Sequence, residues 1–228
     1  MAAKPKTSAK RLLIVDDHPM MRTGLAQLID NESDLKVCAE ADNAGQAINA
    51  VTRQKFDLAL VDISLPDKNG LELLKDIRSL KPELPVLVVS MHDELIYAER
   101  ALRAGARGYI MKQEGGEKFL QAIRQVLAGR VFVSDKMSAR ILENFSGASV
   151  ERTASAVQRL SDREFEVFQL IGQGIGTSEI AKRLHLSVKT VEAHRKNIKE
   201  KLNTATATDL VRYAVRWLDA QGQMTDIK

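Results

Sequence analysis

The chain has 228 residues, of which 44% are hydrophobic and 28% charged, the balance of an ordinary globular protein. No apolar run is long enough to cross a membrane, and the amino terminus lacks the apolar segment of a signal peptide. The single cysteine, Cys38, excludes an intrachain disulfide and a cysteine-based metal site. We therefore expect a cytoplasmic protein of two domains that does not associate with membranes.

Charge is divided unequally along the chain, although the net charge is only +4. Residues 11–130 carry 16 Lys/Arg against 18 Asp/Glu, whereas residues 159–228 carry 12 against 9. An acidic N-terminal part and a basic C-terminal part indicate two different functions, and the basic part could bind an anionic polymer.

Strand and helix patterns alternate five times over residues 11–129. Short continuous apolar runs predict strands at 11–17, 36–41, 58–61, 85–89 and 107–111, and apolar residues at helical spacing follow each run. This alternation predicts an α/β fold, a doubly wound parallel sheet of five strands with helices on both faces. The flavodoxin-like strand order 2-1-3-4-5 is the expected one.

Four of the predicted strands end in polar side chains that suit phosphate chemistry, namely Asp16-Asp17, Asp62, Ser90 and Lys112. In the expected strand order these four ends lie side by side and converge on one pocket. Three clustered carboxylates need a cation, and oxygen ligands with open positions suit Mg²⁺. Asp62 would be the nucleophile, because carboxylates form aspartyl-phosphates, and Lys112 would pair with a phosphoryl oxygen. The residues specify a Mg²⁺-dependent phosphoryl acceptor.

Other readings of these residues are weaker. An aspartate at a strand end can simply cap a loop, but one loop cap does not explain four converging polar ends. A haloacid-dehalogenase-type phosphatase would use the pattern DxDx[TV], and here Ser64 stands two residues after Asp62, so the general acid is missing. Three of the histidines, His18, His92 and His185, are isolated in the sequence, and none suggests a catalytic triad with Ser90.

Residues 130–157 change character. Ser134 and Asp135 predict the start of a short helix that runs through Phe145, and residues 146–156 are small and polar. We expect a linker that contains one helix and then a mobile segment. Residues 1–10 and 223–228 are expected to be tails without regular structure.

The last part of the chain has only helical signals. Ser161 and Glu164 form the pattern of a capping box, and Ser187 predicts the N-cap of a helix over 188–202 that follows a short turn. A helix, a short turn and a second helix have the form of a helix-turn-helix. On the second of these helices an apolar stripe defines a buried side and leaves a basic side for DNA. The expected DNA-binding residues are Lys189, Thr190, Glu192, Ala193, Arg195, Lys196 and Lys199.

Residues 11–129 resemble the receiver domain of bacterial two-component response regulators. The similarity rests on Asp16-Asp17, on Asp62, Pro66 and Gly70 in the pattern DxxLPxxxG, on Ser90, on Gly105-Ala106, and on Tyr109 three residues before Lys112. It implies that Asp62 accepts a phosphoryl group from a sensor histidine kinase. It also implies that Mg²⁺ is held by Asp16, Asp17, Asp62 and the backbone carbonyl of Ser64, and that Ser90 and Tyr109 reorient on phosphorylation. Gln113 departs from the proline that many receivers have after the lysine.

Residues 158–222 resemble the LuxR-type helix-turn-helix domain. The carriers are Leu160-Ser161-x-Arg163-Glu164, Gly174, Glu179-Ile180-Ala181, and Leu186-Ser187-x-x-Thr190-Val191-Glu192-x-His194-Arg195. Residues 203–208 depart from the family where it often has an arginine before the acidic residue, here Asp209. Together the two halves are similar to a NarL/FixJ-type response regulator, a transcription factor.

The resemblance also sets expectations for partners. It implies a regulator that promotes only its own phosphorylation and dephosphorylation, and otherwise acts on no substrate. It implies a homodimer on phosphorylation, double-stranded DNA with inverted half-sites, and contact with RNA polymerase as a further partner. The alternative is a receiver that serves as a protein-interaction module, in a protein that binds DNA without phosphate control. The intact set of Asp16, Asp17, Asp62, Ser90 and Lys112 favours phosphate control.

Overall fold

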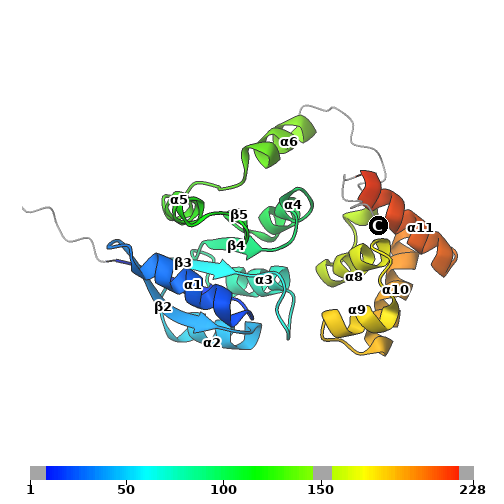
Figure 1. Ribbon diagram of the computed structural model, residues 1–228, viewed down its shortest axis with the longest axis horizontal. Helices are drawn as coiled ribbons and strands as arrows, with labels where there is room; N and C mark the ends of the chain where they lie inside the picture. The colour runs from blue at the N-terminus through cyan, green and yellow to red at the C-terminus, as the bar shows by residue number, and fades with distance from the viewer. Residues whose placement is uncertain (1–8, 146–155, 221–228) are drawn as a thin grey trace, which may run out of the picture. The chain divides into compact units, whose positions relative to one another are not determined.

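The computed structural model describes residues 9–145 and 156–220, except for the side chains of residues 143–145. It divides into two compact units, residues 1–142 and 143–228 (Figure 1). The expected tails, apart from residues 9 and 10, and almost all of the expected mobile segment lie outside the described residues. The domain boundaries at 129/130 and 157/158 therefore stay predictions.

The first unit is built on a five-stranded sheet in the order β2-β1-β3-β4-β5, with every neighbouring pair parallel. This confirms the α/β fold class and the flavodoxin-like order. The strands are β1 (Lys10–Val15), β2 (Leu35–Ala41), β3 (Leu58–Val61), β4 (Val86–Ser90) and β5 (Gly108–Met111). The helices that alternate with them are α1 (Pro19–Asp30), α2 (Ala44–Arg53), α3 (Gly70–Leu80), α4 (Glu94–Ala104) and α5 (Gly116–Leu127).

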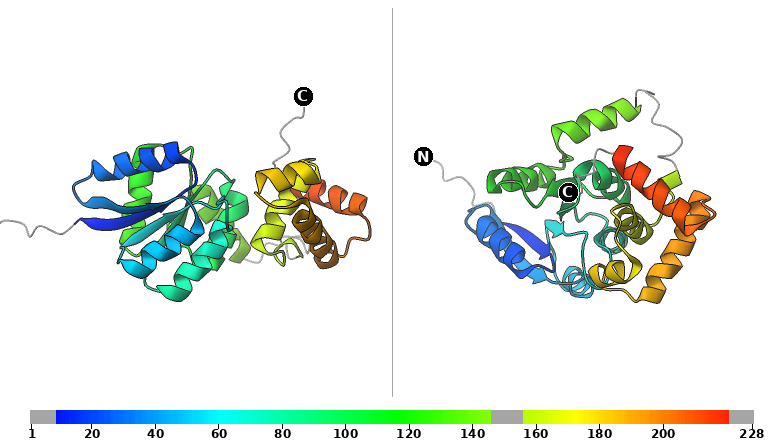
Figure 2. Two further views of the ribbon diagram at one scale, coloured as in Figure 1. Left: turned by 90° about the horizontal axis from the view of Figure 1, so that it is seen from below. Right: turned by 45° about the vertical axis from the view of Figure 1, so that its right-hand side comes forward.

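The sheet is buried on both faces, which explains why its strands are continuous apolar runs rather than alternating ones. Alternate strand residues such as Ile14 and Leu60 join side chains of α1 and α5 in one core cluster. The remaining helices α2, α3 and α4 cover the opposite face (Figure 2). All strand C-termini thus open at one edge of a rigid three-layer unit.

Short polar residues fix where the helices begin. Asn43, Asn69 and Asp93 are N-caps whose side chains accept backbone N–H groups of α2, α3 and α4. Gly105 ends α4 in the left-handed conformation with φ of 110°, which favours glycine. Several strand boundaries differ from the sequence prediction by one or two residues; β1, for example, spans Lys10–Val15 instead of 11–17. Lys10 belongs to β1 rather than to the tail, because its backbone N–H donates to Asp34 and its ammonium pairs with Asp57.

The chain that leaves α5 stays attached to the first unit. Phe132 forms a parallel bridge with Gly108 at the β5 edge, and Tyr109 N–H donates to the Phe132 carbonyl. Glu94, in the first turn of α4, accepts the backbone N–H of Ser134 at 2.7 Å. The helix α6 (Asp135–Phe145) follows and buries Met137. We call residues 131–134 the strap.

The second unit is all-helical, with α8 (Asp162–Gly172), α9 (Thr177–Arg183), α10 (Val188–Leu202) and α11 (Ala207–Ala220). The predicted capping box of Ser161 and Glu164 is present, as is the predicted N-cap at Ser187. Trp217 packs edge-on against Phe165 and Phe168, which joins α11 to α8. None of the helices among the described residues combines the length and the apolar character that a bilayer span requires.

Candidate functional site

The carboxylates at the ends of β1 and β3 are buried and face one ammonium group. Asp16 and Asp62 are 1% and 2% exposed. The Nζ of Lys112, just beyond β5, lies 2.7 Å from Oδ2 of Asp16 and 2.8 Å from Oδ2 of Asp62. The strand order therefore brings together the three charged groups that the sequence placed at separate strand ends.

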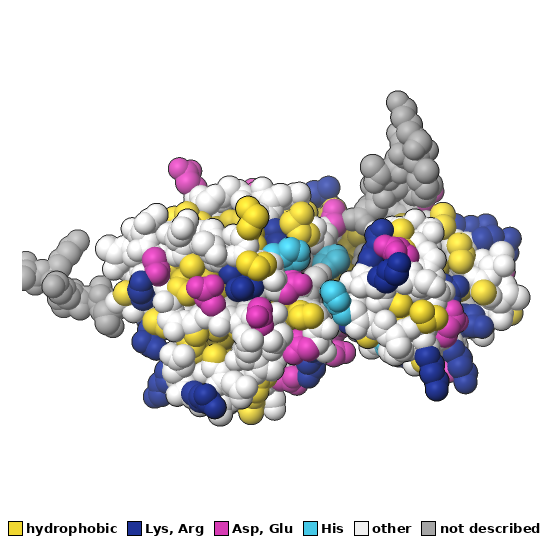
Figure 3. Space-filling model, turned by 60° about the horizontal axis from the view of Figure 1, so that its bottom comes forward, with side chains coloured by type: hydrophobic (Ala, Val, Ile, Leu, Met, Phe, Trp, Pro, Cys, Tyr) yellow, Lys and Arg dark blue, Asp and Glu magenta, His cyan; other side chains and the backbone are white. Residues whose placement is uncertain are grey.

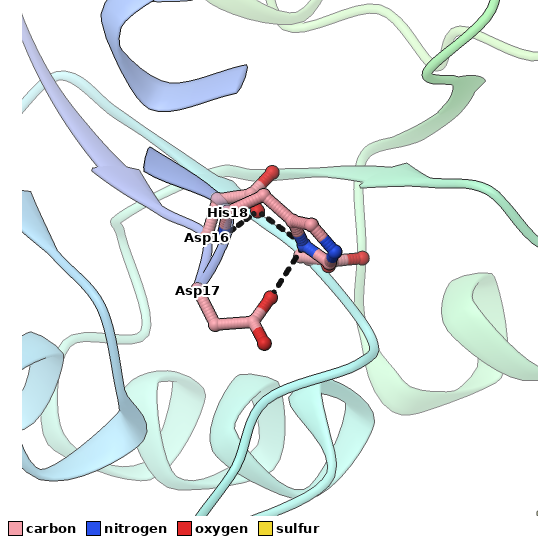
Figure 4. A group of neighbouring side chains, drawn as sticks. Asp16, Asp17 and His18 are labelled. Carbon is pink, nitrogen blue, oxygen red and sulfur yellow. Dashed lines mark hydrogen bonds and ion pairs between the residues drawn. The ribbon is translucent and has the colours of Figure 1, made fainter. Parts of the chain in front are cut away.

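Asp17 and His18 complete the acidic cluster (Figure 4). The Nδ1 of His18 lies 2.7 Å from Asp17 and 3.4 Å from Asp16, so the expectation of an isolated His18 is wrong. Ligand atoms of Asp16, Asp17, His18 and Asp62 all lie within 4.8 Å of one another. The signal in the sequence was the adjacency of His18 to Asp16 and Asp17.

Burial dominates the electrostatics of Asp62. Desolvation raises its pKa to about 6, against the opposing effects of the Lys112 ammonium and of the Ser64 backbone N–H. For Lys112, burial lowers the pKa, but Asp62 and Asp16 outweigh it and hold the pKa above its usual value. Lys112 thus compensates part of the negative charge of the two buried carboxylates.

The cluster fits a divalent cation with oxygen ligands. Oδ1 of Asp62 is buried and has no hydrogen-bond partner among the described residues, which is costly for a carboxylate oxygen unless something else binds it. Asp16 and Asp17 supply further oxygens next to it. Such a donor set suits Mg²⁺, which binds a few carboxylates and keeps open positions for water or phosphate. Asp16, Asp17 and Asp62 are the side chains that would hold it.

Glycine is required at position 70, where the loop after β3 folds back onto its own backbone. The backbone N–H of Gly70 donates to the Ile63 carbonyl at 2.7 Å. A Cβ at Gly70 would lie 1.9 Å from the carbonyl oxygen of Asp62, far inside van der Waals contact. Any side chain at this position would push away the backbone that carries Asp62.

Ser90 and Tyr109 are both fully buried and both contact His92. The Oγ of Ser90 accepts the His92 backbone N–H at 3.2 Å, and the Tyr109 hydroxyl donates to the His92 carbonyl at 2.8 Å. Burial keeps the pKa of Tyr109 above its usual value, so its hydroxyl is a neutral donor. The predicted switch residues thus share one neighbour that sequence reasoning overlooked.

The side chain of His92 is also engaged. Its Nε2 lies 3.0 Å from the hydroxyl of Ser64, and its ring stacks on Tyr97 with centroids 4.4 Å apart. Desolvation and the positive charge of Lys112 lower the pKa of His92 to about 4. The imidazole is therefore neutral at pH 7, and the expectation of an isolated His92 is wrong.

In the second unit, α10 has a buried and an open side as predicted. Val191, Ile198 and Leu202 are buried in the helical core. Of the expected DNA-binding residues, Thr190, Arg195 and Lys199 are partly buried, and Thr190 bonds the Ser187 hydroxyl. The exposed ones are Lys189, Glu192, Ala193 and Lys196.

One ion pair links α10 to α8, and an arginine of α8 binds the end of α9. The ammonium of Lys201 lies 2.6 Å from the Glu164 carboxylate, so its positive charge is paired within the helical unit. Arg163 binds Glu166 and the Leu184 carbonyl just before the turn to α10. In the space-filling view, Lys and Arg side chains gather along edges of the helical unit, and both signs of charge are interspersed on the α/β unit (Figure 3).

Comparisons with known proteins agree with this architecture. Residues 12–124 match the family model of the response regulator receiver domain, and residues 158–214 match that of bacterial regulatory proteins of the luxR family. The oxygen regulatory protein NreC of Staphylococcus aureus (strain JH9) is 37% identical over 210 residues, which cover 90% of this chain and 97% of NreC.

Solved structures that are similar include two response regulators. RcsB of Salmonella enterica serovar Typhimurium, bound to promoter rprA in the presence of the phosphomimetic BeF3-, is 26% identical with a TM-score of 0.59, covering 91% of this chain and 98% of that one. A two-component response regulator of the LuxR family from Aurantimonas sp. SI85-9A1 is 34% identical with a TM-score of 0.57, covering 61% of this chain and 99% of that one. The chain therefore belongs to the NarL/FixJ family and is a DNA-binding response regulator of a two-component system.

Proposed function

We propose that Asp62 is the phosphoryl acceptor of this regulator and that a sensor histidine kinase is the donor. The observation that carries the proposal is the buried Oδ1 of Asp62, which has no hydrogen-bond partner among the described residues while Oδ2 is held by Lys112. One oxygen is thus oriented and the other is available to react.

The transfer uses groups of this chain at each point. Oδ1 of Asp62 forms a bond to phosphorus as the bond from phosphorus to the kinase imidazole nitrogen breaks, and that nitrogen keeps the bonding electrons. Lys112 lies beside Oδ2, so a small shift brings its ammonium to a phosphoryl oxygen. The hydroxyl of Ser90 donates to a second oxygen. Mg²⁺, held by Asp16, Asp17, Asp62 and the Ser64 backbone carbonyl, would neutralise the charge of the phosphoryl group.

Replacement of the nucleophile tests the assignment. Asp62→Asn keeps the size of the side chain and removes its nucleophilic oxygen, so labelling by acetyl phosphate or by kinase should fall to background. The matched control is Asp67→Asn, an exposed residue of the same loop whose carboxylate accepts backbone N–H groups at the start of α2. Labelling of wild-type protein should also vanish in excess chelator and return with Mg²⁺. Undiminished labelling of Asp62→Asn contradicts the assignment.

For the second unit we propose that α10 enters the major groove and that phosphorylated dimers bind inverted half-sites. Lys189, Glu192, Ala193 and Lys196 would face the bases, and Thr190, Arg195 and Lys199 would contact phosphates. A single helix-turn-helix makes few contacts, so two-fold symmetry supplies the missing specificity. RNA polymerase is the expected partner of the bound dimer.

The two units would be coupled by inhibition, in which the unphosphorylated receiver reduces DNA binding and phosphate relieves it. The test compares full-length protein, with and without a phosphoryl mimic, with a fragment that begins at Val157. Operator affinity and sedimentation mass are measured for each. Inhibition predicts that the fragment and the mimic-bound protein bind more tightly than the unmodified chain. If the fragment binds no more tightly than the unmodified chain, and the mimic changes neither the affinity nor the mass of the full-length protein, a receiver that acts as an interaction module without phosphate control is favoured.

A further inference from the structure

His92 joins the two loops that flank the acceptor. Its ring nitrogen Nε2 lies 3.0 Å from the hydroxyl of Ser64, which belongs to the loop after β3, whereas His92 itself belongs to the loop after β4. This hydrogen bond between two side chains links the loop after β3 directly to the loop after β4. The roles given above to Asp62, Ser90 and Lys112 do not use it.

The register of the sheet places this link just beyond the reacting groups. Val61 of β3 pairs with Val88 of β4, so Asp62 and Ser90 follow at the adjacent ends of neighbouring strands. Ser64 and His92 each come two residues later in their loops. The link therefore ties together the backbones that carry the acceptor carboxylate and the phosphate-binding hydroxyl.

The ring is held from a second side, and the backbone of the same residue holds both switch residues. Stacking on Tyr97 of α4, at an interplanar angle of 26°, leaves the imidazole little rotational freedom. With the ring fixed, the His92 N–H orients the Ser90 hydroxyl and its carbonyl keeps the Tyr109 hydroxyl inside. The neighbouring Met91 is 66% exposed and makes no such anchor.

We propose that His92 is a positioning residue for phosphoryl transfer: its side chain, bound to Ser64 and stacked on Tyr97, fixes the backbone that presents the Ser90 hydroxyl to Asp62. The inference rests on the proposed function of Asp62. It adds a residue that touches neither the phosphoryl group nor the cation. Its effect on the rate is transmitted through Ser90.

Two substitutions separate the two anchors. His92→Phe keeps a ring that can stack on Tyr97 and loses the hydrogen bond to Ser64, whereas His92→Gln keeps an amide that can reach Ser64. In full-length protein at saturating acetyl phosphate and Mg²⁺, His92→Phe should label at least fivefold more slowly. His92→Gln should recover to within twofold of wild type. The control Met91→Ala should match wild type, and Mg²⁺ affinity measured by calorimetry should change less than twofold in all three.

Ser64→Ala breaks the same link from its other end, so it should slow labelling as much as His92→Phe and the double variant should be no slower than either single one. A second cycle uses Ser90→Ala. In the Ser90→Ala background, His92→Phe should slow labelling less than twofold, because the hydroxyl that His92 positions is absent. A general structural defect would instead cost the same factor in every background.

Several results overturn the inference: a His92→Phe rate equal to wild type, a full additional loss in the Ser90→Ala background, or an unaffected rate in Ser64→Ala. Thermal unfolding of each variant identifies loss of fold, and Ser64→Ala carries the test if His92→Phe does not fold. Failure of the proposed function looks different, because wild-type protein would then not be labelled or Asp62→Asn would be.

Discussion

The ammonium of Lys112 lies within 2.8 Å of a carboxylate oxygen of Asp62 and, at the same time, within 2.7 Å of one of Asp16. Under the proposed function, the ammonium would compete with Mg²⁺ for the same two carboxylates and would also pair with an oxygen of the phosphoryl group. Its two roles predict opposite effects of the same substitution.

Replacement of Lys112 by Met should slow labelling by acetyl phosphate roughly 100-fold, the order of magnitude for loss of one donor to a developing charge. Mg²⁺ affinity at pH 8, measured by calorimetry, should stay equal or rise, because the competing ammonium is gone. The control is Lys118→Met on α5, whose lysine pairs with Glu114 away from the acceptor. A parallel loss of Mg²⁺ affinity and labelling would mean that Lys112 only supports the fold of the site.

On α10, Lys196→Ala should weaken binding to a specific operator more than binding to random DNA, by about 1–3 kcal/mol, since the proposed docking of α10 would bring its exposed ammonium to a base. Lys199→Ala should weaken both equally and reduce the salt slope by about 1, as expected of a phosphate contact. Fluorescence anisotropy over a salt series measures both effects. Lys55→Ala, an exposed lysine of the first unit, controls for net charge. Identical profiles for the two α10 variants would show that base and phosphate contacts are misassigned.

The ion pair of Glu164 predicts how the helical unit responds to acid. Burial raises the pKa of Glu164, but the Lys201 ammonium and the Ser161 backbone N–H outweigh it, so the folded-state pKa lies below the usual value. The ionised carboxylate therefore stabilises the folded unit above the unfolded-state pKa, and this contribution is lost as pH falls through the folded-state pKa.

Glu164→Gln should lower the free energy of unfolding at pH 7 by roughly 1–2 kcal/mol, and its difference from wild type should shrink between pH 5 and pH 3. Trp217 is the only tryptophan and packs on α8, so its fluorescence follows this unit within the full chain. Glu179→Gln, which breaks an exposed pair on α9, should have little effect. A pH-independent difference would show that charge is not the cause.

A fragment that ends at residue 129, the predicted domain boundary, should be less stable than one that ends at Leu142. The shorter fragment loses Phe132 and Met137, which are only 6% and 1% exposed. Burial of these side chains contributes about 3 kcal/mol, after a discount for residual burial in the unfolded chain. Urea unfolding of the two fragments, followed by circular dichroism, measures the difference. Equal stabilities would mean that the strap and α6 pack too loosely to belong to the receiver.

Much of the fold and of the acceptor site could be predicted because both depend on local pattern. Buried parallel strands are continuous apolar runs, and the strand order alone brings Asp16, Asp62 and Lys112 together. Similarly, the apolar stripe of Val191 and Ile198 fixed the buried side of α10.

Contacts between loops and single-residue pairings were not predictable in this way. Ser64 and His92 are 28 residues apart, and their hydrogen bond depends on the three-dimensional path of the two loops, which no local pattern predicts. Lys201 follows the basic pattern of α10, but its partner Glu164 lies on another helix. Phe132 forms a single isolated bridge, and it is not part of an apolar run of the kind that predicts a strand.

The hydrogen bond from the Ser134 N–H to Glu94 ties the strap to the first turn of α4. Glu94 is a buried carboxylate, and its first turn of α4 starts only four residues after Ser90. If α6 lifts away, this carboxylate loses a charge-assisted donor, at a cost of about 1–3 kcal/mol until water replaces it. A displacement of the first turn of α4 would therefore act through this hydrogen bond on the strap and on α6, the part of the receiver from which the chain leads to the DNA-binding unit.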